Sequence, residues 1–446
     1  MSEQVADLGS LGGGGGQDEV YVTTFTRGRV GPSETMLGPV KSGGRIVTGT
    51  PPGCWSPMIT PAFQGGHEVT QPVAVEGAEV GDSVALTLER CRNVSEASSS
   101  GVDSFLEGRY KQDPFVAKIC PNCGAENPES YVEGIGPESI HCKECGAEAS
   151  VFRFAHGYTV VMDKEHDVAI TVPPEVAAKV ANNAKALHHS PANVAAHPIL
   201  LYGAGEMPGV ITRVMPFLGN IGTTPSANMP DSHNAGDFGQ FLIGADHEFG
   251  VKDEEELNRH KTDGHMDCAQ VREGAVLICP VKVPQAGVYM GDMHAMQGNG
   301  EVAGHATDSA SEVECRVDLL KGVTIDGPIL LPVYEDLPHL LRPVTKEMRR
   351  HAEALAQKYG VGELEESGPV QFIGSGKDLN AATKNGLERA AKATGLSFEE
   401  VQNRATITGS IEIGRLPGVV KVGLLCPMPV LDRMGIGDIV RKQYDL

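Results

Sequence analysis

The chain has 446 residues, a formal net charge of −21 and 40% hydrophobic residues, so it can build a sizeable core. Its length indicates two or three domains, or one large β unit with appendages. The dense negative charge excludes nucleic acid as a general partner and favours solubility. No signal pattern and no apolar run long enough for a membrane span is present, so we expect a cytoplasmic protein without a membrane partner.

The N-terminal quarter predicts a glycine-rich arm followed by a β domain. Glycine lowers the gain from ordering, so residues 1–18 are expected to be disordered. Residues 19–117 form the predicted N-terminal β domain, with strand-like runs at Val20–Thr26 and Ser83–Leu88. The Ser-rich residues 96–103 are interpreted as a linker.

Residues 118–149 are predicted to form an inserted zinc ribbon. They contain two Cys-x-x-Cys pairs: Cys120 with Cys123, and Cys142 with Cys145. Each pair places two thiolates on a tight turn, and two such turns complete a tetrahedral four-sulfur site for structural zinc. The alternative is a set of free or redox-active thiols. His141 is a neighbour of this site rather than an expected ligand.

Residues 150–446 are predicted to be a β-rich catalytic domain with helices near the C-terminus. Glycine and proline are dense over 199–250, and loops of that density often carry function. Acidic and apolar residues alternate over 311–320, which predicts a half-buried strand. The remaining predictions are a helix from Pro174 to Leu187, helices capped by Thr345, Asn380 and Ser397, and strands at 405–413 and 419–425.

The stretch Gly291–Glu301 carries the first candidate for chemistry. Asp292 and His294 are two residues apart, so on a strand both side chains point to one face. The glycines that follow allow a sharp turn that brings Glu301 back toward them. One imidazole and two carboxylates could hold a divalent metal with open positions or act as a general base; a polar turn with a surface histidine is the alternative.

A second candidate is the segment Asp263–Asp267, which contains His265. An Asp-x-His cluster can bind a metal, although it is often only a solvated loop. Three weaker candidates contain residues that more often have ordinary structural roles: His67–Glu68, His188–His189 with His197, and Asp246–Glu248. No Gly-x-Ser-x-Gly elbow is present, which argues against an α/β-hydrolase serine.

The stretch Gly287–Glu301, GVYMGDMHAMQGNGE, resembles the acetamidase/formamidase family, which has a Gly-Asp-Leu-His-x-x-Gln-Gly-Asp-Gly-Glu motif there. Pro72–Asp82 resembles the "VEGAEPGD" turn of that family. Asp263–Asp267 lies where the family has a Gly-Gly-Asn-Met-Asp segment, and Asn380–Leu425 resembles its closing region. Here His265 replaces the usual Asn and Asn299 the usual Asp, and simpler members lack the ribbon insert.

The resemblance implies a mainly β (α+β) fold, with a jelly-roll-like β-sandwich core, a few C-terminal helices and a homo-oligomeric assembly such as a dimer or trimer. It also implies hydrolysis of short aliphatic amides and a divalent metal, zinc or calcium, in the active site. The match to the family motif implies functional roles for Asp267, Asp292, His294 and Glu301, while His265 could add a metal ligand or a base.

The mechanism we expect is metal-assisted attack of water on the amide. Asp292, His294 and Asp267 would hold the cation, and Glu301 would move the proton of the water. Two alternatives remain at this point. One is hydrolysis of another small C–N substrate, an N-formyl compound or a cyclic amide. The other is a zinc-ribbon adaptor without enzymatic activity.

Overall fold

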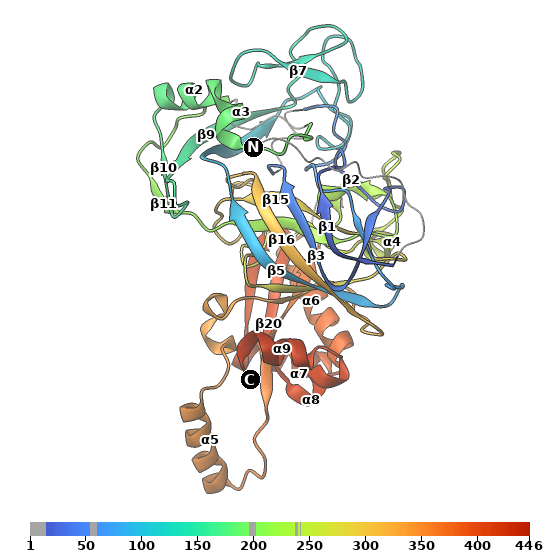
Figure 1. Ribbon diagram of the computed structural model, residues 1–446, viewed down its shortest axis with the longest axis vertical. Coiled ribbons are helices and arrows are strands. Elements are labelled where there is room, and N and C mark those ends of the chain that lie inside the picture. The colour runs from blue at the N-terminus through green and yellow to red at the C-terminus, as the bar shows by residue number, and fades with distance from the viewer. Residues whose placement is uncertain (1–14, 54–59, 196–201, 237–239, 241) are drawn as a thin grey trace.

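The computed structural model describes residues 15–53, 60–195, 202–236, 240 and 242–446, and its fold is mainly β, as predicted (Figure 1). Twelve strands form one large sheet in the order β12-β15-β4-β3-β16-β5-β14-β17-β18-β20-β19, and β1 pairs with β3. Their bounds are β1 Gln17–Val22, β3 Leu37–Thr50, β4 Val73–Val75, β5 Ser83–Asn93, β12 Phe217–Thr223, β14 Val276–Pro280, β15 Val288–His294, β16 Ser311–Leu320, β17 Ile329–Leu331, β18 Ser367–Ser375, β19 Ser410–Arg415 and β20 Val419–Pro427.

The side chains of strand β16 alternate between a buried and a more exposed face of the sheet. Val313, Cys315 and Val317 are at most 1% exposed, whereas Glu312 points outward, as the alternating sequence predicts. On both sides β16 has long antiparallel partners, β3 and β5. Valine and other β-branched residues fit such a pleated, half-buried surface, and here they form one continuous apolar core with β5, β14 and β15.

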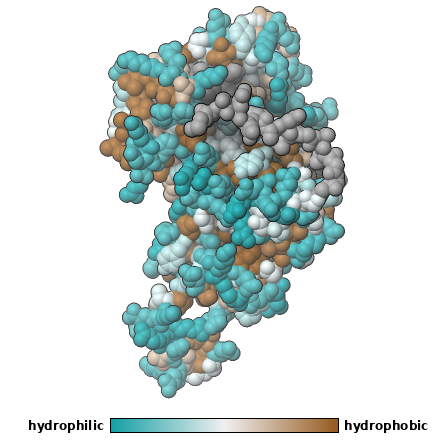
Figure 2. Space-filling view, viewed as in Figure 1, coloured by the Kyte–Doolittle hydropathy of each residue, from teal (hydrophilic) through white to brown (hydrophobic). Residues whose placement is uncertain are grey.

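The C-terminal part of the sheet is covered by helices. The helices α6 (Leu379–Thr394) and α7 (Phe398–Thr408) pack on β18 and β20, while α8 (Met428–Arg433) and α9 (Gly437–Tyr444) close the chain. Helix α5 (Lys346–Tyr359) begins at its predicted Thr345 cap and ends at Gly360, yet none of its residues is buried. Figures 1 and 2 show α5 at the tip of an arm that projects from the rest of the molecule.

A second, four-stranded sheet corrects the prediction of a linker at 96–103. Its strands are β6 (Ala97–Phe105), β9 (Phe152–Met162), β10 (Val168–Thr171) and β11 (Ile211–Arg213), in the order β11-β10-β9-β6. Ser98, Ser99 and Ser100 are fully buried in β6, and the hydroxyl of Ser99 lies 2.7 Å from that of Thr159. The segment was interpreted as a linker because it is rich in serine; here the Ser99 hydroxyl has its partner in β9, and the Ser98 hydroxyl donates to the Asp308 carbonyl.

Two boundaries near the C-terminus also differ from the prediction. Residues 405–413 were expected to form a strand, but α7 continues to Thr408 and β19 begins only at Ser410. The β-branched run over 406–408 favours a strand locally, and packing of α7 on β20 overrides that preference. Helix α6 is capped by Asp378, whose carboxylate accepts from Ala381 N at 2.8 Å, and not by Asn380.

Shorter elements complete the fold, and those labelled β2, β7, α2 and α3 lie around the upper end of the large sheet in Figure 1. They are β2 Arg29–Val30, β7 Ser130–Val132, β8 Ile140–Cys142, β13 Met229–Pro230, α2 Pro174–Asn182, α3 Ala184–His188, α4 Glu254–His260 and the 3₁₀ turns η2 Asp231–His233, η4 Tyr334–Asp336 and η5 His339–Leu341. Helices α2 and α3 cover the helix predicted to end near Leu187. No described helix has the length and apolar content needed to cross a membrane.

The domain limits proposed from the sequence stay a prediction. Strands from 17–93 and from 217–427 share the large sheet, so residues 19–117 and 150–446 contribute to one structure. Residues 1–14 of the proposed arm lie outside the described residues, and Gln17 and Asp18 already belong to β1.

Candidate active site

Asp292 and His294 lie on one face of β15, within a buried cluster of histidines and carboxylates. His294 Nε2 is 3.0 Å from Asp292 Oδ1, and both residues are at most 1% exposed. The same carboxylate reaches two further imidazoles: Oδ1 is 3.4 Å from His67 Nε2, and Oδ2 is 3.7 Å from His265 Nε2. One carboxylate therefore faces the Nε2 atoms of three imidazoles.

Each of these three imidazoles donates a hydrogen bond from its other ring nitrogen, Nδ1, to an oxygen. The donations run from His67 to Asp231 Oδ2 at 2.5 Å, from His265 to the Ser232 carbonyl at 3.0 Å, and from His294 to Gln297 Oε1 at 2.9 Å. A carbonyl or carboxylate oxygen can only accept, so these contacts assign the proton to Nδ1. This arrangement leaves the Nε2 lone pair for a metal, as in histidines that bind one.

Three more carboxylates complete the cluster, which lies at the meeting point of several chain segments. The atoms able to bind a cation lie within 4.8 Å of one another in three overlapping sets: His67, His265 and Asp292; Asp267, His294 and Glu301; and Asp292, His294 and Asp308. The sets share Asp292 and His294, so they form one continuous group. Arg415 adds a positive charge at its edge, with Nε 2.9 Å from Asp267 Oδ2.

Several buried oxygens of this group make no hydrogen bond within the described part of the chain. They are Asp267 Oδ1, Asp292 Oδ2 and Glu301 Oε2. Leaving a buried carboxylate oxygen without a partner is costly, and such atoms indicate an ion or a ligand. Imidazole nitrogens together with carboxylate oxygens are suitable ligands for zinc, and carboxylates alone suit calcium. The residues therefore fit a divalent cation.

The backbone around the cluster is strained where the ligand groups attach. Asp267, Asp292 and Glu301 have φ values of 49°, 55° and 42°, in the left-handed region that residues with a side chain rarely adopt. Such strain costs about 1–3 kcal/mol per residue and gathers at functional sites. Gly219 leaves the required space, because a Cβ there would lie 2.4 Å from both Asp267 Oδ1 and Asp292 Oδ2.

The charges of the cluster shift the pKa values of two histidines, His67 and His294, upward. Burial alone would lower the pKa of His67, but the carboxylates of Asp292 and Asp231 raise it to about 9. Burial likewise opposes protonation of His294, and Asp292 at 3.0 Å raises the pKa of this imidazole well above its ordinary value. Without a cation, protons on the histidines balance the negative charge, so a cation that binds here must displace them.

The carboxyl groups divide into two classes. Burial raises the pKa of Asp308 to about 7, and burial together with the Asp267 carboxylate raises that of Glu301 well above its ordinary value. Burial acts in the same direction on Asp292, but His67 and His294 outweigh it and hold the pKa of Asp292 below its usual range. Glu301 therefore takes up a proton easily, whereas Asp292 stays ionised.

The sequence interpretation brought together five residues that the structure also places together: His265, Asp267, Asp292, His294 and Glu301. It gave His67 little weight and did not identify Asp231, Asp308 or Arg415. The glycines at 53, 65 and 66 were a usable signal for His67, because a loop so rich in glycine approaches other groups closely. Asp308 and Arg415 carry no local signal; only the folded sheet brings them near β15.

Of the other weaker candidates, His188 borders the cluster, since its ring forms a hydrogen bond with the backbone of Asp308. Burial lowers the pKa of His188 to about 4, and its Nδ1 lies 3.1 Å from Ser190 Oγ. Glu248 forms an ion pair with Arg29 at 2.9 Å, in a surface loop. His197 lies outside the described residues.

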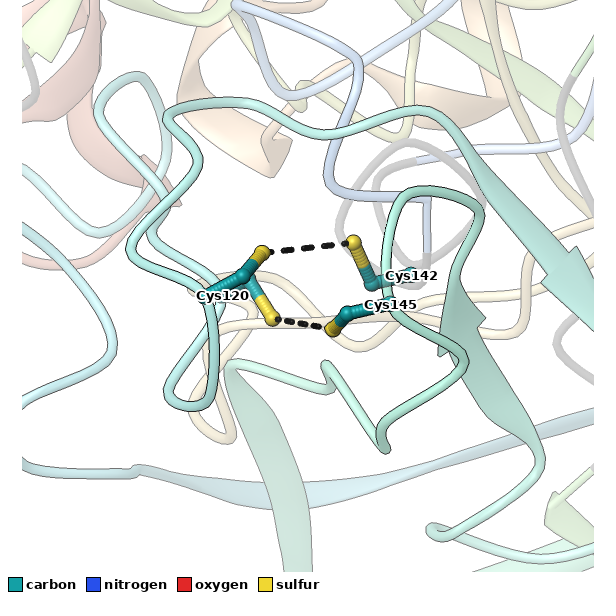
Figure 3. A group of neighbouring side chains, drawn as sticks. Cys120, Cys142 and Cys145 are labelled. Carbon is teal, nitrogen blue, oxygen red and sulfur yellow. Dashed lines mark hydrogen bonds between the residues drawn. The ribbon is translucent and has the colours of Figure 1, made fainter.

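The four cysteines of the insert also come together. Cys120 Sγ is 3.6 Å from Cys145 Sγ, and Cys123 Sγ is 3.9 Å from Cys142 Sγ, with the two turns facing each other (Figure 3). Zinc–sulfur bonds of about 2.3 Å in a tetrahedron place sulfurs about 3.8 Å apart, which fits these distances. The four thiols could hold a metal ion. His141 stacks on Tyr131 with ring centroids 5.3 Å apart, as a neighbour of the site.

The fold agrees with that of one solved structure whose TM-score exceeds 0.5, and two further structures are reported beside it. A predicted acetamidase/formamidase from Thermoanaerobacter tengcongensis has a TM-score of 0.51 and 17% identity, over 94% of this chain and 98% of that one. An acetamidase from Bacillus halodurans has a TM-score of 0.49 and 15% identity, over 94% and 99%. An acetamidase from Yersinia enterocolitica has the same score and identity, over 93% and 94%.

Comparison with curated proteins gives no match. The model of the acetamidase/formamidase family, however, matches residues 53–433, which is most of the chain and includes every residue of the buried cluster. The protein is thus a member of the acetamidase/formamidase family and an enzyme that hydrolyses amides.

Proposed function

We propose that the buried cluster hydrolyses short aliphatic amides, of the size of formamide and acetamide, to a carboxylate and ammonia with the help of a divalent cation. One observation carries this proposal. Three imidazoles each donate a hydrogen bond from Nδ1 to a protein oxygen, and all three direct Nε2 toward the carboxylate of Asp292. Such pre-oriented nitrogens around a buried carboxylate support a cation-binding site, and membership of the family supports amides as substrates.

The residues that would hold the cation are drawn from the sets of overlapping ligand atoms. Asp292 is shared by two of them, and His67, His265 and His294 supply nitrogens. Zinc suits the mixed nitrogen and oxygen donors, whereas calcium would be held by the carboxylate oxygens alone. When bound, the cation would supply Lewis-acid chemistry: it would polarise the amide carbonyl and make a nearby water more acidic.

Glu301 is the proposed general base and acid. Its pKa is raised by burial and by Asp267, so its carboxylate accepts a proton from the attacking water. The same carboxyl then delivers that proton to the nitrogen that leaves as ammonia, which restores Glu301 for the next turnover. The left-handed conformation of Glu301 aims its side chain back at His294 and Asp267, within the 4.8 Å set.

The cysteine insert has a separate proposed role. Four thiolates fill a tetrahedral coordination sphere, so a zinc held by Cys120, Cys123, Cys142 and Cys145 would stabilise structure and leave no position for a substrate. Assembly as a dimer or trimer and a cytoplasmic location remain predictions from the sequence.

The test uses the purified enzyme and measures ammonia release from formamide and acetamide, together with the free amine liberated from an N-formyl amine and a γ-lactam, which release no ammonia. We expect turnover of the two short amides, loss of turnover in His294→Gln, and normal turnover in the matched control His351→Gln, which changes an exposed histidine on α5. Ammonia release from none of the short amides would exclude the proposal; hydrolysis of only the lactam or the N-formyl amine would move it to that substrate class.

A further inference from the structure

The 3₁₀ turn η2 (Asp231–His233) holds two of the three histidines of the cluster in place. The Asp231 carboxylate accepts from His67 Nδ1 at 2.5 Å and from the backbone N of His67 at 3.0 Å. The next residue, Ser232, accepts from His265 Nδ1 through its carbonyl at 3.0 Å. A three-residue turn therefore fixes both ring orientations, and any shift of η2 moves both Nε2 atoms.

This turn is itself fixed by the segment that leads into the zinc ribbon. His233 Nε2 lies 2.5 Å from Asp113 Oδ2, and its Nδ1 lies 2.8 Å from Ser232 Oγ. A carboxylate only accepts, so His233 donates from Nε2 and accepts at Nδ1 from the Ser232 hydroxyl. The same hydroxyl oxygen accepts from Gly66 N at 3.0 Å, immediately before His67.

Lys118 makes a second connection from this segment to the loop that leads into His67. It is 0% exposed, and its Nζ donates to the Phe63 carbonyl at 2.8 Å and to the Phe115 carbonyl at 2.6 Å. Phe115 in turn packs edge-on against the His233 ring, with centroids 6.1 Å apart. The segment from Asp113 to Lys118 therefore contacts both η2 and the loop that leads into His67.

We propose that Asp113 is a positioning residue of the active site: through His233 and Ser232 it sets the orientation of His67 and His265, and so links the segment that leads into the insert to the catalytic centre. The inference rests on the proposed cation-binding function of the cluster. Hydrogen-bond partners behind metal ligands typically contribute 10–100-fold to metal affinity. Asp113 is 3% exposed, as such a partner should be.

Asp113→Asn is the informative change, because it keeps the size of the side chain but leaves one accepting oxygen where two are used. Asp113 Oδ1 accepts from Phe115 N at 2.9 Å while Oδ2 accepts from His233. With the oxygen kept for Phe115, the amide nitrogen faces His233 Nε2 and forces the opposite tautomer, so Ser232 loses its acceptor. A role limited to filling space would not respond to this change.

The measurement is Co²⁺ titration of the metal-free protein by absorption spectroscopy. Sulfur-to-cobalt charge-transfer bands report the four-cysteine site, and ligand-field bands without them report the buried cluster. We expect Asp113→Asn to weaken Co²⁺ binding at the cluster by about 10–100-fold and to leave the cysteine site unchanged. The control variant Glu126→Gln removes an exposed negative charge within the insert and should bind Co²⁺ like wild type at both sites.

Thermal melting of each variant shows whether it folds, and Ser232→Ala tests the same chain of hydrogen bonds from its other end. Cluster affinity within twofold of wild type in both Asp113→Asn and Ser232→Ala would overturn the proposal. Equal losses at both metal sites with a lowered melting temperature would also overturn it, because the role would then be structural. Wild type that binds Co²⁺ at the cluster but releases no ammonia from amides would contradict the proposed function and leave this inference standing.

Discussion

The cysteine site and the buried cluster are two groupings of metal-binding side chains built in opposite ways. The four cysteines lie between residues 120 and 145, on two similar turns, and Cys123 and Cys145 are exposed. The cluster draws its ligand atoms from His67 to Asp308, and all of them are buried. A local site can form as soon as its own turns form, whereas the cluster exists only after the large sheet has folded.

The difference in donors separates structure from chemistry. Four identical thiolates saturate a tetrahedral ion, so nothing is left to bind or to exchange a proton. The cluster mixes three imidazoles with four carboxylates, and two of these have pKa values shifted in opposite directions, that of Asp292 downward and that of Glu301 upward. Separated pKa values of neighbouring acids are typical of sites that perform acid–base catalysis. Changes at the two sites should therefore affect different measurements.

The largest expected effect is at Glu301. Glu301→Gln keeps the shape of the side chain but cannot take a proton, so kcat for acetamide should fall by about 10²–10⁴-fold. Glu312→Gln on β16, an exposed residue of the same type, is the control and should keep its activity. The assay is steady-state ammonia release together with the metal content of each variant. Near-normal kcat in Glu301→Gln would remove this residue from the mechanism.

A smaller effect is expected from added methyl groups, and it compares the two sites directly. A Cβ at Gly219 would collide with Asp267 and Asp292, so Gly219→Ala should weaken cation binding at the cluster by at least about 10-fold. Gly124, after the first cysteine pair, has φ +75° and open space around it. There alanine costs only backbone strain, about 1 kcal/mol. If Gly219→Ala at the cluster and Gly124→Ala at the cysteine site lost cation affinity equally, the proposed difference between the two sites would be contradicted.

Loss of the cysteine site should disturb catalysis less than either change in the cluster. In Cys120→Ser/Cys142→Ser the ribbon should lose its zinc and become sensitive to proteolysis near residues 120–145. Asp113 and Lys118 keep their own contacts with the body, so we expect turnover to fall by about 10-fold or less. Metal analysis of this variant should show loss of the thiolate-bound ion and retention of any ion in the cluster; loss of both would show that the two sites fold as one.

The same contrast explains what the sequence could predict. The cysteine site was predicted as a set because its spacing is a local property of two turns. The motif Gly291–Glu301 and the segment Asp263–Asp267 were identified for the same reason, since strand alternation and glycine turns act over a few residues. Family resemblance, and not geometry, joined the two into one site.

The remaining members depend on tertiary structure. Asp308 lies near His294 because the segment after β15 returns beside it, and Arg415 lies near Asp267 because β19 ends there. The sequence did not predict strand β6 for a similar reason, since the hydroxyls of Ser99 and Ser98 have their partners in β9 and in the loop of Asp308. No pattern within a few residues encodes such contacts.

The smallest expected effect concerns a carboxylate outside both sites, Asp82, which shows how a purely structural acid behaves. Burial would raise its pKa, but the backbone N of Gly322, at 2.8 Å, and Lys321 lower it below the ordinary value. The folded state therefore binds this proton less readily than the unfolded chain. Its contribution is complete above the unfolded pKa of about 3.9 and disappears as pH falls through the folded value.

Asp82→Asn should therefore destabilise the protein at pH 7 by about 1 kcal/mol, and the difference from wild type should shrink between about pH 4 and pH 2. Urea unfolding at several pH values measures it, with ammonia release at pH 7 as the second readout. Unlike Glu301→Gln, this variant should keep full activity, because the Asp82 carboxylate bonds to Lys321, to Gly322 N and to Glu79 N, and to no residue of the cluster. A stability difference that grows toward low pH would mean that folding raises the pKa of Asp82 above its unfolded value, as burial raises that of Asp308 to about 7.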